Sequence, residues 1–340
     1  MSGDELTVAN LSVHYPLPGG GLLGRHRREL VAVNDVSFTL RAGQTLGIVG
    51  ETGCGKSSLG KAILQLVRPA AGQVIWRGQN LCELTSKQLK PLRKDLQIIF
   101  QDPLSSLNPR MTIGEIVAEP LLIHSPELTA RQREKAALDM LERVGLGAGM
   151  AKRYPNEFSG GQCQRASIAR AMILKPRIIV CDEPVSALDV SIQAQICNLL
   201  KELQRDTGIA MIFISHDLSI VRYMSHRIMV MYLGRVMELA GRDSFFARPL
   251  HPYSRALVRS IPVPDPDQPL HTYLQTLEDE PPSPLTPPSG CAFRTRCSQA
   301  TPVCVARRPE LDEASSGHAV ACHFWQEIEP STTSQETTDD

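Results

Sequence analysis

Four short apolar runs in the chain predict strands that are buried on both faces. They lie at residues 46–49, 96–100, 178–181 and 210–214, and each has the length and composition of a strand in a parallel sheet. Stretches with helical periodicity separate these runs, which is the order of elements in an α/β domain. We therefore expect an α/β core in which helices cover a mixed or parallel sheet.

A second group of strands is expected around the first apolar run. Residues 5–15 alternate between apolar and polar positions, and similar short patterns occur at 30–33, 36–40 and 73–77. The segment 16–28 is rich in glycine and basic residues and predicts an exposed loop. Together these strands predict an antiparallel β subdomain beside the α/β core.

Helical patterns dominate from about residue 110 to 175, which predicts an inserted α-helical subdomain. Thr129 and Gln132 have the spacing of a capping box, which begins a helix that ends near Val144. A further helix follows Ser159. This block interrupts the α/β pattern between two of its buried strands.

The α/β pattern extends to about residue 260, so the first domain is expected at 5–260. Residues 262–290 contain nine prolines, which disfavour a packed helix or a central strand there. We expect a loop-rich tail at 261–326. A disordered end rich in Ser, Thr and acidic residues is expected at 327–340. The remaining elements of the first domain are helices at 191–205 and 217–225 and strands at 227–232 and 235–239.

A glycine-rich turn joins the first buried run to a helix expected at 59–67. It has the pattern G-x-x-x-x-G-K-[ST], in which backbone N–H groups and the helix N-terminus surround an anion. We expect Lys56 to reach the β- and γ-phosphates of a nucleotide and the Ser57 hydroxyl to bind Mg²⁺. An ordinary glycine turn is the alternative, but the strand-turn-helix order favours a phosphate site. Its residues are Gly50, Glu51, Thr52, Gly53, Cys54, Gly55, Lys56, Ser57 and Ser58.

Polar side chains follow the other buried strands, at the edge where parallel α/β sheets bind ligands. We expect Asp182 to hold Mg²⁺ and Glu183, the next residue, to polarise an attacking water. Gln101 is expected to contact Mg²⁺ or that water. His216 is expected near the γ-phosphate, although a lone histidine at a strand end is more often structural. Tyr15, expected in the first loop, is a candidate to stack on an adenine ring.

The charge balance and the apolar pattern exclude several classes of function. Lys plus Arg and Asp plus Glu each number 36, so the formal net charge of zero gives no indication of nucleic-acid binding. No apolar run approaches the roughly 18 residues of a membrane span, and the N-terminus does not have the order of a signal peptide. We therefore expect a cytoplasmic protein that meets a membrane only through a partner.

A second glycine motif, Ser159-Gly160-Gly161-Gln162, is by itself most often an ordinary helix cap. Its glycine-lined helix N-terminus can also receive an anion, which is reasonable here if it serves a neighbouring subunit. With all these motifs in this order, the chain resembles the ATP-binding-cassette (ABC) ATPases over about residues 5–260. In that resemblance Walker A is Gly50–Ser57, the Q-loop is Gln101, the signature is Phe158–Gln162 with Phe where Leu is commoner, Walker B is Ile178–Glu183, the D-loop is Ser186–Asp189 and the H-loop is His216.

The resemblance implies that two cassettes pair head to tail around ATP and Mg²⁺. Each ATP then lies between Walker A of one subunit and the signature, Ser159 to Gln162, of the other. Asp189 is carried over in the same way as a nucleotide-site residue of the D-loop. Closure on ATP and opening after hydrolysis are expected to drive a membrane partner.

Segments near the C-terminus resemble the tail of the peptide-importer ATPases. They are Pro249–Leu257 and two runs at 281–285 and 288–297. Their sequences resemble most closely the F-type subunits of bacterial oligopeptide permeases. The dipeptide and nickel branches of the family share much of this sequence. The resemblance implies uptake of oligopeptides or dipeptides at the cytoplasmic face of the cell inner membrane. The implied partners are a second, D-type ATPase subunit, two transmembrane permease subunits and a periplasmic or extracellular peptide-binding protein.

Four of the nine cysteines lie close together in this tail, at Cys291, Cys297, Cys304 and Cys322. Four thiolates in a loop-rich segment can hold a small metal centre, although these do not form the CxxC pairs usual for zinc. The resemblance favours a [4Fe-4S] cluster. Free thiols are the main alternative, and disulfides are the least favoured in a reducing cytoplasm.

Two other functions are weighed against peptide import. Cassette proteins that act on DNA or ribosomes usually carry two cassettes, long inserts or an excess of basic charge, and this chain shows none of these. An ATPase that has lost hydrolysis would lack part of its catalytic set, but Lys56, Glu183 and His216 are all present.

Overall fold

The computed structural model describes residues 6–17, 29–261 and 280–327. Three expectations of the sequence therefore lie wholly or partly outside the described residues: the loop at 16–28, the proline-rich stretch at 262–290 and the disordered end at 327–340. Over the described ranges, no helix combines the length and the apolar character needed to cross a membrane.

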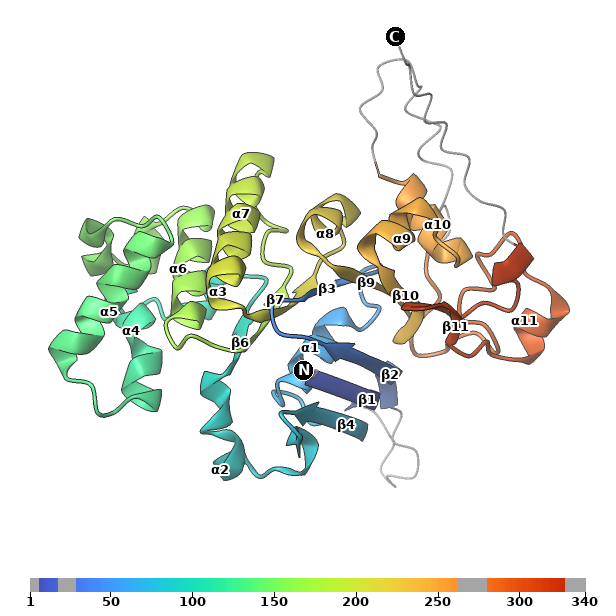
Figure 1. Cartoon of the computed structure of the whole chain (residues 1–340), viewed down its shortest axis with the longest axis horizontal. Helices are drawn as coiled ribbons and strands as arrows, with labels where there is room; N and C mark the ends of the chain where they lie inside the picture. The colour runs from blue at the N-terminus through green and yellow to red at the C-terminus, as the bar shows by residue number, and fades with distance from the viewer. Residues whose placement is uncertain (1–5, 18–28, 262–279, 328–340) are drawn as a thin grey trace, which may run out of the picture.

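A mixed sheet of eight strands forms the centre of the molecule, in the order β11-β12-β10-β9-β3-β8-β7-β6 (Figure 1). The strand before the phosphate loop, β3, lies between β8 and β9 and is parallel to both, and β7 and β6 continue the parallel part. The outer strands β10, β12 and β11 pair antiparallel. The bounds are Thr45–Val49 for β3, Leu96–Ile99 for β6, Ile178–Asp182 for β7, Ala210–Ile214 for β8, Arg227–Tyr232 for β9, Arg235–Gly241 for β10, Asp312–Ser315 for β11 and His318–Val320 for β12.

A smaller antiparallel sheet, in the order β2-β1-β4-β5, packs below the main sheet in the view of Figure 1. The two strands predicted at 30–33 and 36–40 are one long strand, β2. The break in its sequence pattern is a local irregularity at Asp35, where φ is +61° and the register with β1 shifts. The bounds are Leu6–Pro16 for β1, Glu29–Leu40 for β2, Ala71–Trp76 for β4 and Gln79–Asn80 for β5.

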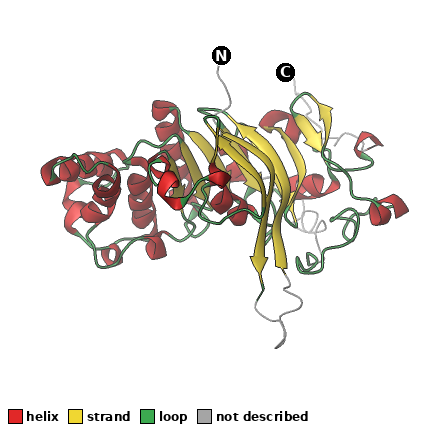
Figure 2. Cartoon of the chain, turned by 90° about the horizontal axis from the view of Figure 1, so that it is seen from below, coloured by secondary structure: helices red, strands yellow, loops and turns green. Residues whose placement is uncertain are grey.

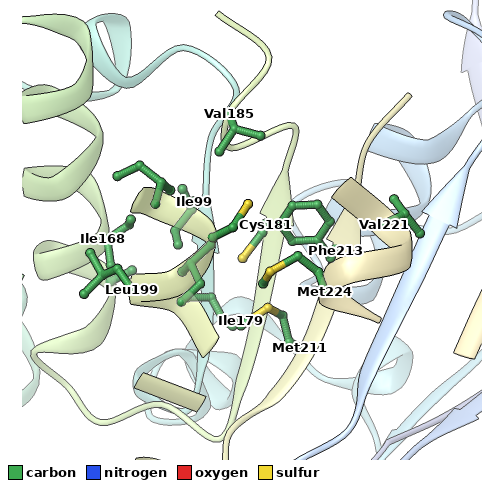
Figure 3. Packing of buried hydrophobic residues seen from close by; sticks show 14 of the residues in the cluster. Ile99, Ile168, Ile179, Cys181, Val185, Leu199, Met211, Phe213, Val221 and Met224 are labelled. Atoms are coloured by element: carbon green, nitrogen blue, oxygen red, sulfur yellow. The ribbon is translucent and has the colours of Figure 1, made fainter. Parts of the chain in front are cut away.

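Successive residues of the parallel strands point into two different hydrophobic clusters, which explains why their sequences are continuously apolar. Ile179 and Cys181 of β7 face the cluster shown in Figure 3. Ile178 and Val180 of the same strand face the cluster shared with the smaller sheet. Helices α6, α7, α8 and α9 cover the first face, while α1 lies between the two sheets (Figure 1).

The helices follow the predicted pattern with two local differences. The helix predicted at 59–67 is α1, which begins earlier and ends at Ile63, because Gln65 adopts φ +55° and breaks the helix. The basic stretch at 87–94 has a helix-like sequence pattern, but it forms the one-turn helix α2 and a short 3₁₀ helix, divided at Pro91. The bounds are Lys56–Ile63 for α1, Ser86–Leu89 for α2, Pro103–Ser106 for α3, Ile113–His124 for α4, Ala130–Arg143 for α5, Gly160–Met172 for α6, Val190–Thr207 for α7, Leu218–Met224 for α8, Arg242–Ala247 for α9, Pro252–Arg259 for α10 and Pro302–Ala306 for α11.

The helical block forms one end of the molecule, where helices gather beside the sheets (Figure 2). Its helices α4, α5 and α6 pack on one another. The capping box predicted at Thr129 is confirmed, since Gln132 N donates to Thr129 Oγ1 at 3.3 Å and Thr129 N donates to Gln132 Oε1 at 2.8 Å.

The tail after residue 280 is less separate than its composition predicts, because it contributes β11 and β12 to the main sheet. Glu238 of β10 is fully buried and holds this junction together. Its carboxylate accepts hydrogen bonds from Leu250 N at 2.9 Å and His251 N at 2.8 Å, and it contacts His318 Nε2 at 2.8 Å. One buried carboxylate therefore joins β10, the start of α10 and β12.

We expect His251 to make the unfolding free energy depend on pH. Burial lowers the pKa of His251 to about 4, against the opposing charge of Glu238. In the unfolded state the pKa of this histidine is about 6.5. When the pH is lowered below that value, the unfolded state binds a proton that the folded state does not bind, so the unfolding free energy decreases as the pH decreases. The expected loss is about 2 kcal/mol between about pH 7.5 and pH 5.

The change His251→Asn tests this, because asparagine keeps an acceptor for Tyr253 N, which His251 Nδ1 binds at 3.0 Å, and does not titrate. Denaturant unfolding at several pH values should give a shallower loss of stability in the variant. An equal pH dependence in both proteins would contradict the assignment.

Candidate functional site

The phosphate loop runs from the end of β3 to the start of α1, and its backbone conformation requires glycine. Gly53 and Gly55 adopt φ values of +81° and +101°. A Cβ atom at Gly55 would lie 2.0 Å from the carbonyl oxygen of Ala32 in β2. The smaller sheet therefore fixes the loop at the point where the helix begins.

Lys56 lies inside this loop, with only 5% of its surface exposed. Its Nζ atom donates to the carbonyl oxygens of Gly50 at 2.7 Å and Glu51 at 3.0 Å. A buried ammonium group needs such acceptors, because it has lost its water. The loop thus holds its own lysine at the N-terminus of α1, where the partial positive charge of the helix adds to that of the side chain.

Ser57 and Asp182 meet at the base of the loop, although they are 125 residues apart. Ser57 Oγ donates to Asp182 Oδ1 at 2.7 Å. Asp182 is 4% exposed, and burial raises the pKa of its carboxyl group. A hydroxyl and a carboxylate oxygen, side by side and withdrawn from water, are the donor types that Mg²⁺ prefers.

Glu183, Gln101 and His216 form a second group, above Asp182. Gln101 Nε2 donates to Glu183 Oε2 at 3.0 Å, and His216 Nδ1 lies 3.5 Å from Glu183 Oε1. The side chain of Glu183 is 13% exposed and that of His216 55%. Glu183 adopts φ +47°, a left-handed backbone conformation that is unfavourable for a non-glycine residue.

These groups line one cleft of about 890 Å³. Tyr15 lies at its wall, and its hydroxyl donates to Ser58 Oγ at 3.2 Å. Tyr15 lies in strand β1, in agreement with the strand predicted at 5–15 and not in the first loop. The predicted residues that line the cleft are Tyr15, Thr52, Gly53, Gly55, Lys56, Ser57, Ser58, Gln101, Glu183 and His216.

Other predicted residues support the cleft without lining it. Gly50 and Glu51 bind Lys56 through their carbonyl groups, and Asp182 lies beneath Ser57. The thiol of Cys54 is buried, which raises its pKa, so it is an inert part of the loop.

Several lining residues were missed by the sequence reasoning. Some are neighbours of predicted residues, such as Asp102 and Pro103 after Gln101. Others come from turns of distant elements, such as Leu233 and Gly234 between β9 and β10. Asp102 and Pro103 could have been predicted, because they directly follow Gln101. No feature of the sequence indicates that Leu233 and Gly234 line the cleft. The missed lining residues are Leu30, Val31, Ala32, Asp102, Pro103, Leu233, Gly234 and Pro284. Ser186 and Ala187, which also line the cleft, belong to the predicted D-loop.

The glycine motif before α6 lies outside this cleft, in the helical block. Ser159 and Gln162 form a reciprocal capping box, with Gln162 N donating to Ser159 Oγ at 3.4 Å and Ser159 N to Gln162 Oε1 at 3.0 Å. At the start of the helix Gly160 is exposed and Gly161 is partly buried. Asp189 caps α7 by accepting from Ile192 N at 3.0 Å. Neither the motif nor Asp189 lines the cleft of its own chain.

The four tail cysteines approach one another around Cys291, whose backbone N donates to the carbonyl oxygen of Cys304 at 2.8 Å. Burial, followed by the charges of Cys291, Cys297 and Cys304, raises the pKa of Cys322 to about 11. All nine cysteines of the chain, which lie within the described residues, are unpaired. Within those residues no group of three or more His, Cys, Asp or Glu side chains stands in position to hold a metal ion.

Comparison with protein families matches two parts of the chain. Residues 33–186 match the ABC transporter family, and residues 237–304 match the oligopeptide/dipeptide transporter C-terminal region. The cleft and the fold define an ATP-binding cassette, and the chain belongs to the family of ABC transporter ATPases.

Individual relatives resemble the chain over nearly its whole length. It is 51% identical to the oligopeptide transport ATP-binding protein OppF of Salmonella typhimurium, over 93% of this chain and 95% of the relative. It is 53% identical to OppF of Haemophilus influenzae, over 93% of this chain and 96% of the relative. These similarities confirm the resemblance to the peptide-importer ATPases.

Solved structures confirm the fold. The dimeric ATP-binding cassette MJ0796, in a post-hydrolysis state bound to ADP and Pi, has a TM-score of 0.62 and 29% identity. The match covers 70% of this chain and 98% of that one. The structure of cbiO1 from Clostridium perfringens, part of the ABC transporter complex cbiONQ, has a TM-score of 0.61 and 25% identity over 72% of this chain and 91% of that chain.

The packing of the α6 N-terminus predicts different effects for its two glycines. A Cβ atom at Gly161 would lie 2.7 Å from Cγ2 of Ile192, a stiff β-branched side chain on α7. At Gly160 the nearest atom, Cδ2 of Leu188, would lie at 3.4 Å. We expect Gly161→Ala to lower the unfolding free energy by about 1–2 kcal/mol, after the gain in helix propensity is subtracted. Gly160→Ala is the matched control and should be neutral in chemical denaturation. Equal effects of the two changes would show that Ile192 moves aside.

Proposed function

We propose that this chain couples ATP hydrolysis to the uptake of oligopeptides or dipeptides through a membrane complex. The observation that supports this most directly is the joining of two parts in one chain. A nucleotide cleft lies in the cassette, and the segment that matches the oligopeptide/dipeptide transporter C-terminal region, 237–304, includes most of strand β10 of the same sheet.

The cleft geometry supports a division of roles among its residues. Lys56 and the backbone N–H groups of the loop bind the β- and γ-phosphates, and Tyr15 stacks on the adenine. Glu183 orients and polarises the attacking water. Gln101, held at 3.0 Å from Glu183, positions that carboxylate, and His216 contacts the γ-phosphate.

Mg²⁺ fits the pair formed by Ser57 and Asp182, since both offer oxygen atoms and the carboxylate is buried beside the hydroxyl. Gln101 is a further candidate ligand. When bound, the ion neutralises charge that develops on the phosphates. The protein's own contribution is to keep these oxygens adjacent at the end of β7 and the start of α1.

A second cassette completes each nucleotide site in this proposal. The signature residues at the start of α6 and the D-loop residue Asp189 lie outside the cleft of their own chain. In this proposal Ser159, Gly160, Gly161, Gln162 and Asp189 therefore serve the nucleotide of the partner. The partner is a distinct D-type ATPase subunit. The other partners are two transmembrane permease subunits and a peptide-binding protein outside the membrane. The chain acts peripherally at the cytoplasmic face of the inner membrane and binds no nucleic acid.

The decisive experiment is ATP hydrolysis by the chain co-purified with its membrane partners. We expect peptide-loaded binding protein to stimulate hydrolysis. The change Glu183→Gln should reduce turnover by about 100-fold or more while ATP still binds, because the carboxylate that polarises water is lost and the phosphate contacts remain.

Two controls separate the parts of this proposal. Gln97→Glu changes a side chain of the neighbouring strand, β6, whose Nε2 donates to the carbonyl oxygen of Arg93. This side chain lies outside the cleft, so the change should leave hydrolysis unchanged. Absence of stimulation by every peptide tested would contradict peptide uptake without affecting the ATPase assignment. Unchanged turnover in Glu183→Gln would remove Glu183 from its proposed role.

We further propose that the four tail cysteines take up a [4Fe-4S] cluster. The donor set supports this, since four thiols share one small region and influence the pKa of one another. In the described structure they do not stand as metal ligands, so the proposal requires the four thiols to move closer together.

Anaerobic purification of the full chain tests the cluster directly. We expect visible absorbance, with about four iron and four sulfide ions per chain, and loss of both in Cys291→Ser. The control Cys82→Ser alters a partly exposed cysteine outside the tail and should retain both signals. Iron-free protein with unreacted thiols would identify the four residues as free cysteines.

A further inference from the structure

The tail reaches the phosphate loop through one buried ion pair. Arg296 lies in the loop that carries Cys291 and Cys297, and its Nη1 atom donates to both carboxylate oxygens of Glu51, at 2.8 and 2.9 Å. The side chain of Arg296 is 5% exposed and that of Glu51 21%. The pair joins residues that are 245 positions apart, one in the tail and one in Walker A.

Aromatic rings cover part of this ion pair. Tyr232 of β9, Tyr253 of α10 and Phe293 of the tail form a three-way cluster, with ring centroids 4.9 to 5.4 Å apart. The guanidinium of Arg296 lies 5.9 Å from the ring centroid of Tyr232. The Nε atom of Arg296 is buried without a hydrogen-bond partner. The energetic compensation for burying this arginine therefore depends strongly on Glu51.

Glu51 transmits this contact to the lysine that binds phosphate. Its backbone N donates to the hydroxyl of Tyr253 at 3.0 Å, and its carbonyl oxygen accepts from Lys56 Nζ at 3.0 Å. Three groups of Glu51 are thus held in place. Arg296 of the tail binds its carboxylate, Tyr253 of α10 binds its backbone N, and Lys56 of the phosphate loop binds its carbonyl oxygen. A shift of the Glu51 side chain changes the position of the carbonyl group that orients Lys56.

Charge gives the contact a second effect. Glu51 places a carboxylate one residue after the start of the phosphate loop, where it opposes a nucleotide with several negative charges. Arg296 neutralises that carboxylate in partly dry surroundings, where charge interactions are strong.

We propose that Arg296 is a positioning residue for ATP binding. From the tail it binds Glu51, which holds the phosphate loop in place and neutralises the negative charge of the Glu51 carboxylate. The alternative is that the ion pair only docks the tail on the cassette. This proposal rests on ATP binding by the cassette and is independent of peptide uptake, so either can fail without the other.

The test is the affinity of the full chain for a fluorescent ATP analogue, measured together with its thermal stability. We expect Arg296→Met to weaken nucleotide binding by about tenfold, which corresponds to about 1.4 kcal/mol. Arg296→Lys keeps the charge but loses the paired geometry, so it should restore part of the affinity. The matched control is Arg294→Met, two residues away, whose side chain binds Ser289 rather than the loop and should leave affinity unchanged.

A double-mutant cycle separates positioning from docking. In a Glu51→Gln chain the opposing carboxylate is absent, so adding Arg296→Met should weaken binding by less than about twofold. An equal tenfold loss in both backgrounds would overturn the proposal. Lower thermal stability with unchanged nucleotide affinity in Arg296→Met would also overturn it, since that is the result expected for docking alone. If Arg296→Met does not fold, Arg296→Lys with the same cycle decides between these outcomes.

Discussion

The architecture depends on keeping a lysine ammonium group almost completely out of water. Lys56 is stabilised by carbonyl oxygens of its own loop, and those carbonyls point inward only because the loop follows a conformation that glycine permits. That conformation is fixed from outside, by the close approach of Ala32 in the smaller sheet to Gly55. The antiparallel subdomain is thus a structural support for the phosphate loop as well as a wall of the cleft.

The position of β3 in the middle of the parallel strands accounts for the rest of the site. Because β8 and β7 follow on one side, the carboxyl ends of three strands bring Ser57, Asp182 and His216 to one edge of the sheet. Both faces of these strands are buried, so the edge is rigid. The α6 glycines lie in the helical block instead and do not line this cleft. A site divided in this way suits an enzyme whose activity depends on the approach of two subunits.

Much of the fold and of the cleft could be predicted because the evidence is local. The apolar runs identify strands buried on both faces, and the motifs place Lys56, Asp182 and Glu183 directly after them. The contacts that could not be predicted join distant residues. No local pattern relates Arg296 to Glu51, or His318 to Glu238, and the weak strand signals at 312–315 and 318–320 become strands only because β10 offers an open edge. Glu238, a lone carboxylate in the apolar strand predicted at 235–239, was the one local signal that a buried polar junction existed.

The tail contacts the nucleotide site directly, through the ion pair of Arg296 with Glu51. An appended segment that served only to bind another protein would need no contact with the phosphate loop. Here Glu238 anchors the tail to the sheet, Phe293 packs against Tyr232 and Tyr253, and the cation that binds Glu51 comes from the tail. The carboxylate of Glu51 in Walker A is paired with that cation at 2.8 Å. Glu51 and Arg296 therefore form one functional unit, so replacing either residue alone leaves a charge that the protein was built to cancel.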